Sequence, residues 1–175
     1  MVVWTASIAL GAAAQLGKDR FLPWAMQVLQ VISARVYVYN DQILIRYTCQ
    51  YAISSIGKII RYVPLHKVAS NLSDIIPQWL NLLPINLNVD NEENDIVIYN
   101  LCSIIRLYIN ECFGQEYEHV DKIHQIIEYY ITIKPQQKQL LSQTLTFIKD
   151  IIRSNWLNMS ELKWYQLSHT LNIQS

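Results

Sequence analysis

Apolar residues recur along the chain every three or four positions, in segments that short polar breaks separate. This spacing is typical of amphipathic α-helices, and the two-residue alternation of a strand does not extend beyond residues 36–39. The pattern therefore predicts an all-α fold. The expected helices span residues 2–16, 20–35, 42–62, 73–83, 96–112, 119–133 and 135–154, with a last helix that starts near 158.

Several residues mark where the predicted helices start and stop. Gly17 can take the left-handed conformation that ends helices, so the first helix is expected to stop there. Pro77 fits the first turn of its helix, where a missing amide hydrogen costs least. The polar run 86–94 is the clearest predicted loop. Glu161, three residues after Asn158, resembles the capping box that starts a helix.

Alternate predicted helices are related by a repeat of about 46 residues. Residues 8–11 recur at 54–57, and Ile56 recurs as Ile104. A period in the forties with two helices per unit is the signature of HEAT or armadillo solenoids. Each unit is too small to bury its own apolar face, so the units stack. The sequence thus predicts an α-α superhelix of about eight helices in antiparallel pairs.

The repeat predicts a single solenoid domain over residues 1–175. Met1 stands directly before a helix that resembles the second of a pair, so we expect a fragment of a longer protein. A solenoid cut at this point exposes an apolar face, which predicts self-association through the first helix. The expected units are 1–17 (second helix of a truncated repeat), 18–64, 65–113, 114–155 and a C-terminal capping helix at 156–175.

The apolar residues also indicate which positions are buried. Gly57 lies within a predicted helix, where glycine costs about 1 kcal/mol relative to alanine, so we expect a close helix crossing to compensate. The tryptophans with apolar helical neighbours are expected in the core. They are Trp24, Trp79, Trp156 and Trp164.

Composition narrows the class of protein. The formal net charge is +0 and 16% of residues are charged, which excludes a strongly basic nucleic-acid binder. No uninterrupted apolar run reaches the roughly 18 residues of a membrane span, and the apolar opening stretch lacks the basic start of a signal peptide. Cys49, Cys102 and Cys112 form no CxxC pattern and are expected as buried thiols in a reducing compartment.

No constellation for catalysis, cofactor binding or metal binding is expected. His119 and His124 are five positions apart, not the four that place two ligands on one helical face, and no carboxylate or cysteine completes a metal set. Cys112 and His119 lack an orienting third residue. We therefore expect a protein that is not an enzyme.

Three stretches go beyond a generic repeat pattern. Residues 9–23 combine an Ala-Leu-Gly helix segment with an aromatic-Pro start of the next helix. Residues 52–60 read AISSIGKII, and residues 76–84 read IPQWLNLLP, with YNLC following at 99–102. In their order and spacing these stretches resemble the C-terminal HEAT repeats of importin-β superfamily nuclear transport receptors (karyopherins), in the importin-five or karyopherin beta-three branch. From Phe113 onward only the helix pattern continues.

The resemblance implies a nuclear import receptor that carries cargo through the nuclear pore and shuttles between cytoplasm and nucleus. It implies that cargo proteins and the GTPase Ran bind on the concave side, with Ran bound mainly by N-terminal repeats that this chain lacks. It also implies that Phe-Gly nucleoporins bind on the convex side. The alternative is a HEAT scaffold or adaptor outside nuclear transport.

The best candidate for protein binding is a polar stripe on the 42–62 helix. Its residues lie three or four positions apart, hence on one face of the second helix of a pair. They are Arg46, Gln50, Ser54, Lys58 and Arg61. The 96–112 helix adds Asn100, Ser103 and Arg106, and a later helix adds Arg153. These cations make the surface mildly basic and suit an acidic partner. An acidic cluster of Glu92, Glu93 and Asp95 could meet basic cargo. Solvated surface is the alternative in each case.

Overall fold

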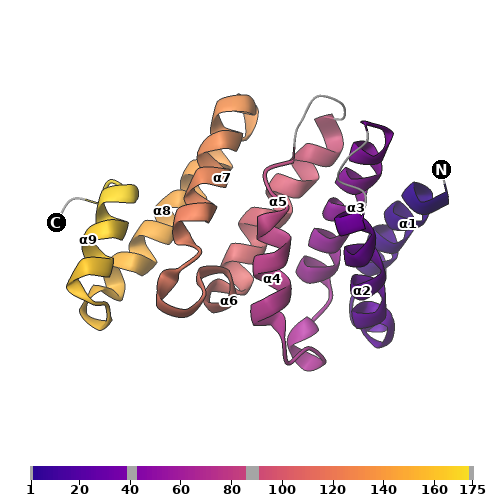
Figure 1. The fold of residues 1–175 in the computed structure, drawn as a ribbon, viewed down its shortest axis with the longest axis horizontal. Helices are drawn as coiled ribbons and strands as arrows, with labels where there is room; N and C mark the ends of the chain where they lie inside the picture. The colour runs from indigo at the N-terminus through magenta and orange to yellow at the C-terminus, as the bar shows by residue number, and fades with distance from the viewer. Residues whose placement is uncertain (1, 39–42, 86–90, 174–175) are drawn as a thin grey trace.

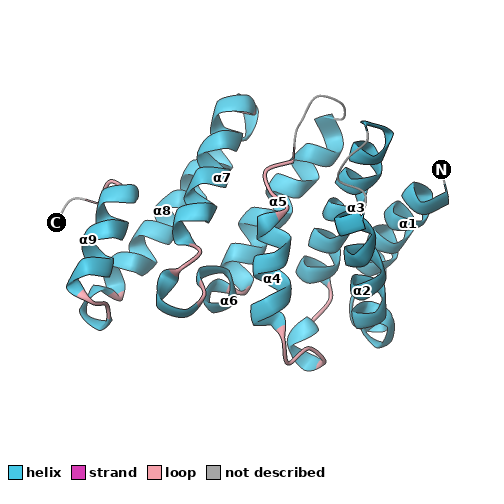
Figure 2. Cartoon of the chain, in the orientation of Figure 1, coloured by secondary structure: helices cyan, strands magenta, loops and turns pink. Residues whose placement is uncertain are grey.

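The computed structural model describes residues 2–38, 43–85 and 91–173. Within these ranges the chain folds into α-helices joined by short turns and 3-10 helices, without a strand (Figure 1, Figure 2). The prediction of an all-α fold is confirmed. No helix in these ranges has both the length and the apolar character of a membrane span. The helices are α1 (Val2–Gly17), α2 (Leu22–Val38), α3 (Ile43–Tyr62), α4 (Leu72–Asn81), α5 (Asn91–Leu107), α6 (Ile109–Phe113), α7 (Val120–Ile133), α8 (Lys138–Ser154) and α9 (Glu161–Thr170). The 3-10 helices are η1 (Lys18–Phe21), η2 (Leu65–Lys67), η3 (Gln115–Tyr117), η4 (Pro135–Gln137) and η5 (Trp156–Asn158).

The helices alternate between two layers. In the first layer α1, α3, α5 and α8 follow one another, with α3 packed between α1 and α5 (Figure 1). In the second layer α2 and α4 pack on α3, α7 packs on α8, and α9 packs on α7. Alternation along a continuous stack is the arrangement of helical-repeat solenoids. The predicted solenoid is thus confirmed, while the boundaries of its repeat units stay a prediction.

One continuous core lies between the layers, from Ala14 in α1 to Ile173 after α9. Its largest fully buried side chains include Trp79 of α4 and Tyr130 of α7. Burial of apolar surface contributes about 25 cal/mol per Å². Because neighbouring pairs of helices share this core, their stacking is what stabilises the fold.

Two tryptophans expected in the core lie on the surface. The side chains of Trp24 and Trp156 are more than half exposed. Each meets another aromatic ring near a helix end, Trp24 with Phe21 at 6.5 Å and Trp156 with Trp164 at 6.2 Å between centroids. Helical spacing of apolar residues indicated burial here, but the contact that forms is a surface aromatic pair.

The first helix ends at Gly17 as expected, but not through a left-handed glycine. Gly17 keeps right-handed angles, φ −77° and ψ −31°, and the positive φ of 45° falls on Lys18 instead. The chain continues directly into η1, so the right-handed turn runs through Gly17. The predicted cap conformation was wrong at this position.

The predicted helix at 96–112 is two helices, α5 and α6, separated at Tyr108 with φ −133° and ψ 52°. The helix also begins earlier than predicted, at Asn91, so part of the expected 86–94 loop is helical. Residues 86–90 lie outside the described residues. The polar residues that indicated a loop form the first turn of α5, where acidic side chains interact favourably with the helix dipole.

Two helix starts also differ from the prediction. Because α4 begins at Leu72, Pro77 lies inside the helix rather than in its first turn. The cap of α9 is Ser160 rather than Asn158, since the Ser160 hydroxyl accepts a hydrogen bond from the Lys163 amide at 3.3 Å. Sequence spacing alone did not distinguish these neighbouring cap candidates.

Gly57 lies at a close helix crossing, as predicted. A β-carbon there would lie 2.8 Å from Cζ2 of Trp79 on α4 and 3.1 Å from Nδ2 of Asn100 on α5. Gly11 allows the same approach of α1 to α3, where a β-carbon would lie 2.7 Å from Oγ of Ser55. The glycines therefore let first-layer helices pack closely and make room for Trp79.

Candidate functional site

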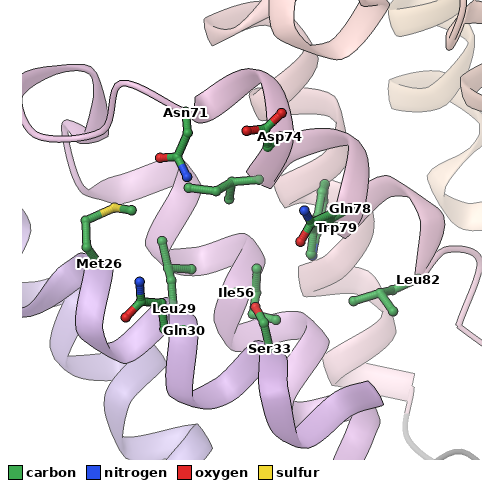
Figure 3. Close-up of a pocket in the computed structure, with 11 residues that line it drawn as sticks. Met26, Leu29, Gln30, Ser33, Ile56, Asn71, Asp74, Gln78, Trp79 and Leu82 are labelled. Atoms are coloured by element: carbon green, nitrogen blue, oxygen red, sulfur yellow. The ribbon is translucent and has the colours of Figure 1, made fainter.

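A pocket lies between α2 and α4, neighbouring helices of the second layer (Figure 3). Both helices pack on α3 but make few contacts with each other. Ile56 of α3 lies between them and lines the base of the pocket (Figure 3). The pocket has a volume of about 160 Å³.

The lining of this pocket is apolar at its base and polar at its rim. The buried lining residues are Leu29, Ile56 and Trp79. The exposed lining residues are Gln30, Asn71, Asp74 and Gln78. Ser33 on α2 also lines the pocket and is half-buried. Apolar walls with a few polar groups at the opening are typical of ligand pockets in proteins.

Trp79 is the largest side chain of this pocket, and its position is fixed. Its indole Nε1 donates a hydrogen bond of 2.9 Å to the carbonyl of Ile53. Gly57 beneath the ring leaves the space that any side chain would fill. One wall of the pocket is thus preformed, since both the polar and the apolar contacts of Trp79 are satisfied within the fold.

The pocket was not predicted from the sequence, although Trp79 belongs to the stretch at 76–84 that resembles the karyopherins. The lining residues of α2 follow helical spacing and come from its half-buried side. They are Met26, Leu29, Gln30 and Ser33. A mixed apolar and polar face of this kind is a weak signal, because the same pattern occurs on any helix at a surface.

The predicted stripe on α3 does not form one solvent-facing surface. Ser54 and Lys58 are buried, while Gln50 and Arg61 are half-buried. The cause is the packing of α3 between α1 and α5, which covers this face. The side chain of Arg46 lies outside the described residues. Protein binding by Gln50 and Arg61 stays a prediction.

The polar groups of α3 instead find partners on α5. Lys58 Nζ lies 3.1 Å from Glu93 Oε1, and these side chains are 10% and 14% exposed. Arg61 Nη1 donates a hydrogen bond of 3.3 Å to Oδ1 of Asn100, which is fully buried. Lys58 and Glu93, which the sequence assigned to separate binding surfaces, therefore join α3 to α5, as do Arg61 and Asn100.

The predicted acidic cluster forms the first turns of α5 rather than a loop. Asp95 Oδ1 lies 3.1 Å from Nζ of Lys134, a buried residue that directly precedes η4. Since Glu93 pairs with Lys58, two carboxylates of the cluster are held by lysines, one from α3 and one from the segment between α7 and η4. Glu92 is exposed. No sequence pattern indicated Lys134, whose partner lies far away along the chain.

The remaining predicted residues lie at the surface of α5. Ser103 is half-buried and Arg106 is exposed. The guanidinium carbon of Arg106 lies 5.8 Å from the ring centroid of Phe147 on α8. Arg106 thus reaches across the first layer toward the next helix and keeps its charge at the surface.

Reactive groups of the described residues do not form a catalytic arrangement. Burial raises the pKa of the Cys112 thiol, with a smaller contribution from Glu111, and burial also raises the pKa of Cys102. Both thiols are therefore protonated at neutral pH and are poor nucleophiles. No group of His, Cys, Asp or Glu side chains in the described ranges could hold a metal ion.

A known protein that is similar in sequence to this chain agrees with the resemblance. The chain is 30% identical over 169 residues to a probable importin-5 homolog of Dictyostelium discoideum, and the match covers 91% of this chain. It spans 15% of the length of that relative. No family model matches the sequence, and no solved structure gives a significant match. The identity supports an importin-β family relationship, and the predicted resemblance is confirmed.

Proposed function

We propose that this chain, related in sequence to importin-β receptors, is a segment of a nuclear transport receptor that binds Phe-Gly nucleoporin repeats in the α2/α4 pocket. The whole receptor would bind cargo proteins and Ran and carry cargo between cytoplasm and nucleus. The family relationship supports this receptor class. Non-covalent binding by a solenoid surface, without a chemical step, is the corresponding activity.

The dimensions and lining of the pocket carry the proposal. An apolar cavity of about 150 Å³ accommodates a benzene ring in a protein interior. The α2/α4 pocket has a similar volume of about 160 Å³, and Leu29, Ile56 and Trp79 at its base provide apolar contacts for a phenyl ring. Aromatic rings gain most from such contacts because of their large apolar surface.

The polar rim suits the peptide that would carry this ring. Gln30, Asn71 and Gln78 are exposed and bear amide groups that can donate to peptide carbonyls and accept from peptide amides. Glycines beside the phenylalanine let a peptide backbone approach the rim closely. A single ring in one pocket gives weak binding, which suits a receptor that must exchange contacts during transport.

Cargo and Ran would then use other surfaces of the solenoid. Glu92 and Arg106 are exposed candidates for such contacts, and Gln50, Ser103 and Arg61 are partly accessible. Among these residues charge complementarity rather than buried apolar area would select the partner.

The test is a titration of the chain with a peptide that contains Phe-Gly pairs separated by serine and glycine. The NMR chemical shifts of the chain report where the peptide binds. Ser33→Leu fills the pocket from its α2 side, whereas Ala34→Leu adds the same side chain at the exposed neighbouring position. We expect the peptide to change the chemical shifts of pocket residues in the wild-type chain and in Ala34→Leu, but not in Ser33→Leu. A peptide without phenylalanine should cause no such changes. Equal binding by both variants, or by a peptide with alanine for phenylalanine, would disprove this site.

A further inference from the structure

Arginine occupies the next-to-last position of three first-layer helices, at Arg61 in α3, Arg106 in α5 and Arg153 in α8. These positions are 45 and 47 residues apart, close to the repeat of the sequence. The helices run in the same direction, so their C-terminal ends lie along one edge of the layer (Figure 1). We call these residues the arginine row. The corresponding position of α1 is Leu16, so the row starts at α3.

Members of the row reach toward the next helix. Arg61 donates from Nη1 to Asn100 on α5, and its guanidinium carbon lies 4.7 Å from the centroid of the Tyr62 ring. Arg106 lies over Phe147 on α8. These contacting groups are neutral, so they orient the guanidinium groups without cancelling their charge.

Arg153 differs because a carboxylate lies near it. Its Nη1 is 3.8 Å from Asp150 Oδ1, and the two side chains are 50% and 62% exposed. An exposed pair at this distance is weak and readily exchanges for another partner. Arg153 can therefore turn toward a bound carboxylate.

The positive potential of the row also acts inside the layer. Burial raises the pKa of Cys102, while a hydrogen bond with Thr144 and, to a smaller extent, the charges of Arg106 and Arg61 oppose this shift. Both guanidinium groups thus act on the same part of α5. An anion bound between Arg61 and Arg106 would be attracted by both charges.

We propose that the arginine row binds an extended acidic segment of a partner protein. Neighbouring packed helices lie about 8–10 Å apart, and an extended chain in the polyproline II conformation has three residues per turn and advances about 3.1 Å per residue. Carboxylates at every third residue would therefore face successive arginines. Guanidinium groups bind carboxylates through paired hydrogen bonds, which gives this arrangement selectivity. The inference rests on the proposed function as a protein-binding receptor and uses a surface separate from the α2/α4 pocket.

Helix capping and nucleic-acid binding by the same arginines predict different behaviour. Arginine near a helix C-terminus stabilises the helix through its dipole, which requires no ligand. Nucleic acid would also be attracted, but strong electrostatic binding of that kind uses about six to ten phosphate contacts. The row supplies fewer cations, and the net charge of the chain is +0. An acidic peptide is therefore the favoured partner.

The experiment measures fluorescence anisotropy of a labelled peptide with glutamate at every third position and glycine or serine between. Arg106→Glu reverses one charge of the row. Lys138→Glu makes the same charge change at the opposite end of α8, also at an exposed residue. We expect the wild-type chain to bind, about tenfold weaker binding in Arg106→Glu, and less than about twofold change in Lys138→Glu.

Four further measurements separate peptide binding from helix capping and from nucleic-acid binding. A peptide with glutamine for glutamate, and one with its glutamates adjacent, should bind more weakly than the spaced peptide. No binding of the spaced peptide, equal affinity of Arg106→Glu and wild type, or tighter binding of an oligonucleotide of equal charge would each overturn the proposal. A lower midpoint of thermal unfolding in Arg106→Glu with unchanged affinity would assign the row to helix capping.

This outcome is independent of the test of the pocket. Arg106→Glu should bind the Phe-Gly peptide as wild type does, and Ser33→Leu should bind the acidic peptide as wild type does. If one of the two surfaces does not bind its peptide, the result for the other surface can therefore still be interpreted.

Discussion

Lys134 and Asp95 form an ion pair that joins the segment before η4 to the first turns of α5, with 3.1 Å between Nζ and Oδ1. The lysine side chain is 4% exposed and the aspartate side chain is 31% exposed. Water can therefore solvate the carboxylate but hardly the ammonium group. Loss of one partner should consequently have a different effect from loss of the other.

We predict that Asp95→Asn lowers the free energy of unfolding by about 2–3 kcal/mol, because it removes the carboxylate that faces a buried ammonium group. Lys134→Met should cost only about 1 kcal/mol, because the remaining carboxylate is partly hydrated and methionine fills similar space. Urea denaturation of both variants measures the difference. The exposed pair of Lys67 and Asp19, at 2.9 Å, is the control, and Asp19→Asn should have no measurable effect. A larger loss of free energy of unfolding in Lys134→Met than in Asp95→Asn would contradict this explanation.

Gly57→Ala should destabilise the chain by about 1–3 kcal/mol, although alanine favours helices, because the new β-carbon would overlap Trp79 Cζ2 at 2.8 Å. The shift of the ring should also change the near-ultraviolet circular dichroism of tryptophan. Gly17→Ala is a suitable comparison, since its β-carbon would meet Phe21 at an ordinary 3.4 Å. If Gly57→Ala were as stable as Gly17→Ala, the close crossing would not be needed for folding.

Tyr130→Phe should lower the free energy of unfolding by about 1–3 kcal/mol. The buried amide of Ile85 donates to the Tyr130 hydroxyl at 3.1 Å, so removal of the hydroxyl leaves that amide without its acceptor. Tyr129 lies next to it but is exposed, and Tyr129→Phe should change stability by less than about 0.5 kcal/mol. Equal effects of the two substitutions in thermal unfolding would rule out this role of the hydroxyl.

Stability should fall at alkaline pH. Burial raises the pKa of Cys112 above its ordinary 9.0 and the pKa of Tyr130 above its ordinary 10.0. The folded chain holds these protons more tightly than the unfolded chain, so the stabilisation is fully present below about pH 9 and is lost as pH rises further. Denaturant midpoints between pH 7 and about pH 11 measure this loss. Tyr130→Phe should show a shallower decline above about pH 10, and a decline as steep as that of wild type would exclude Tyr130 as its source.

Helical periodicity was sufficient to locate most helices. The predicted helix at 119–133 matches α7 within one residue, because its buried residues follow helical spacing without interruption. The start of α5 was misplaced, because its polar first turn has the composition of a loop. The break at Tyr108 was also missed, since apolar spacing continues on both sides of it.

The candidate binding surfaces depend on contacts that spacing along one helix does not contain. Lys58 is shielded from solvent because α5 packs beside it. The partner of Lys134 is Asp95, which lies on a distant helix of the chain. The α2/α4 pocket likewise exists because two helices share α3 as a base while staying apart. Sequence spacing indicated the faces of helices but not their distances from one another.

The lysines on either side of α5 have a mechanical consequence. Apolar contacts lose much of their attraction once a gap of about 1 Å opens, whereas attraction between charges falls only in inverse proportion to distance. When the stack is stretched, the pairs Lys58 with Glu93 and Lys134 with Asp95 still pull after neighbouring apolar contacts have weakened. We therefore expect the two ion pairs to oppose separation of α5 from the elements that pack beside it.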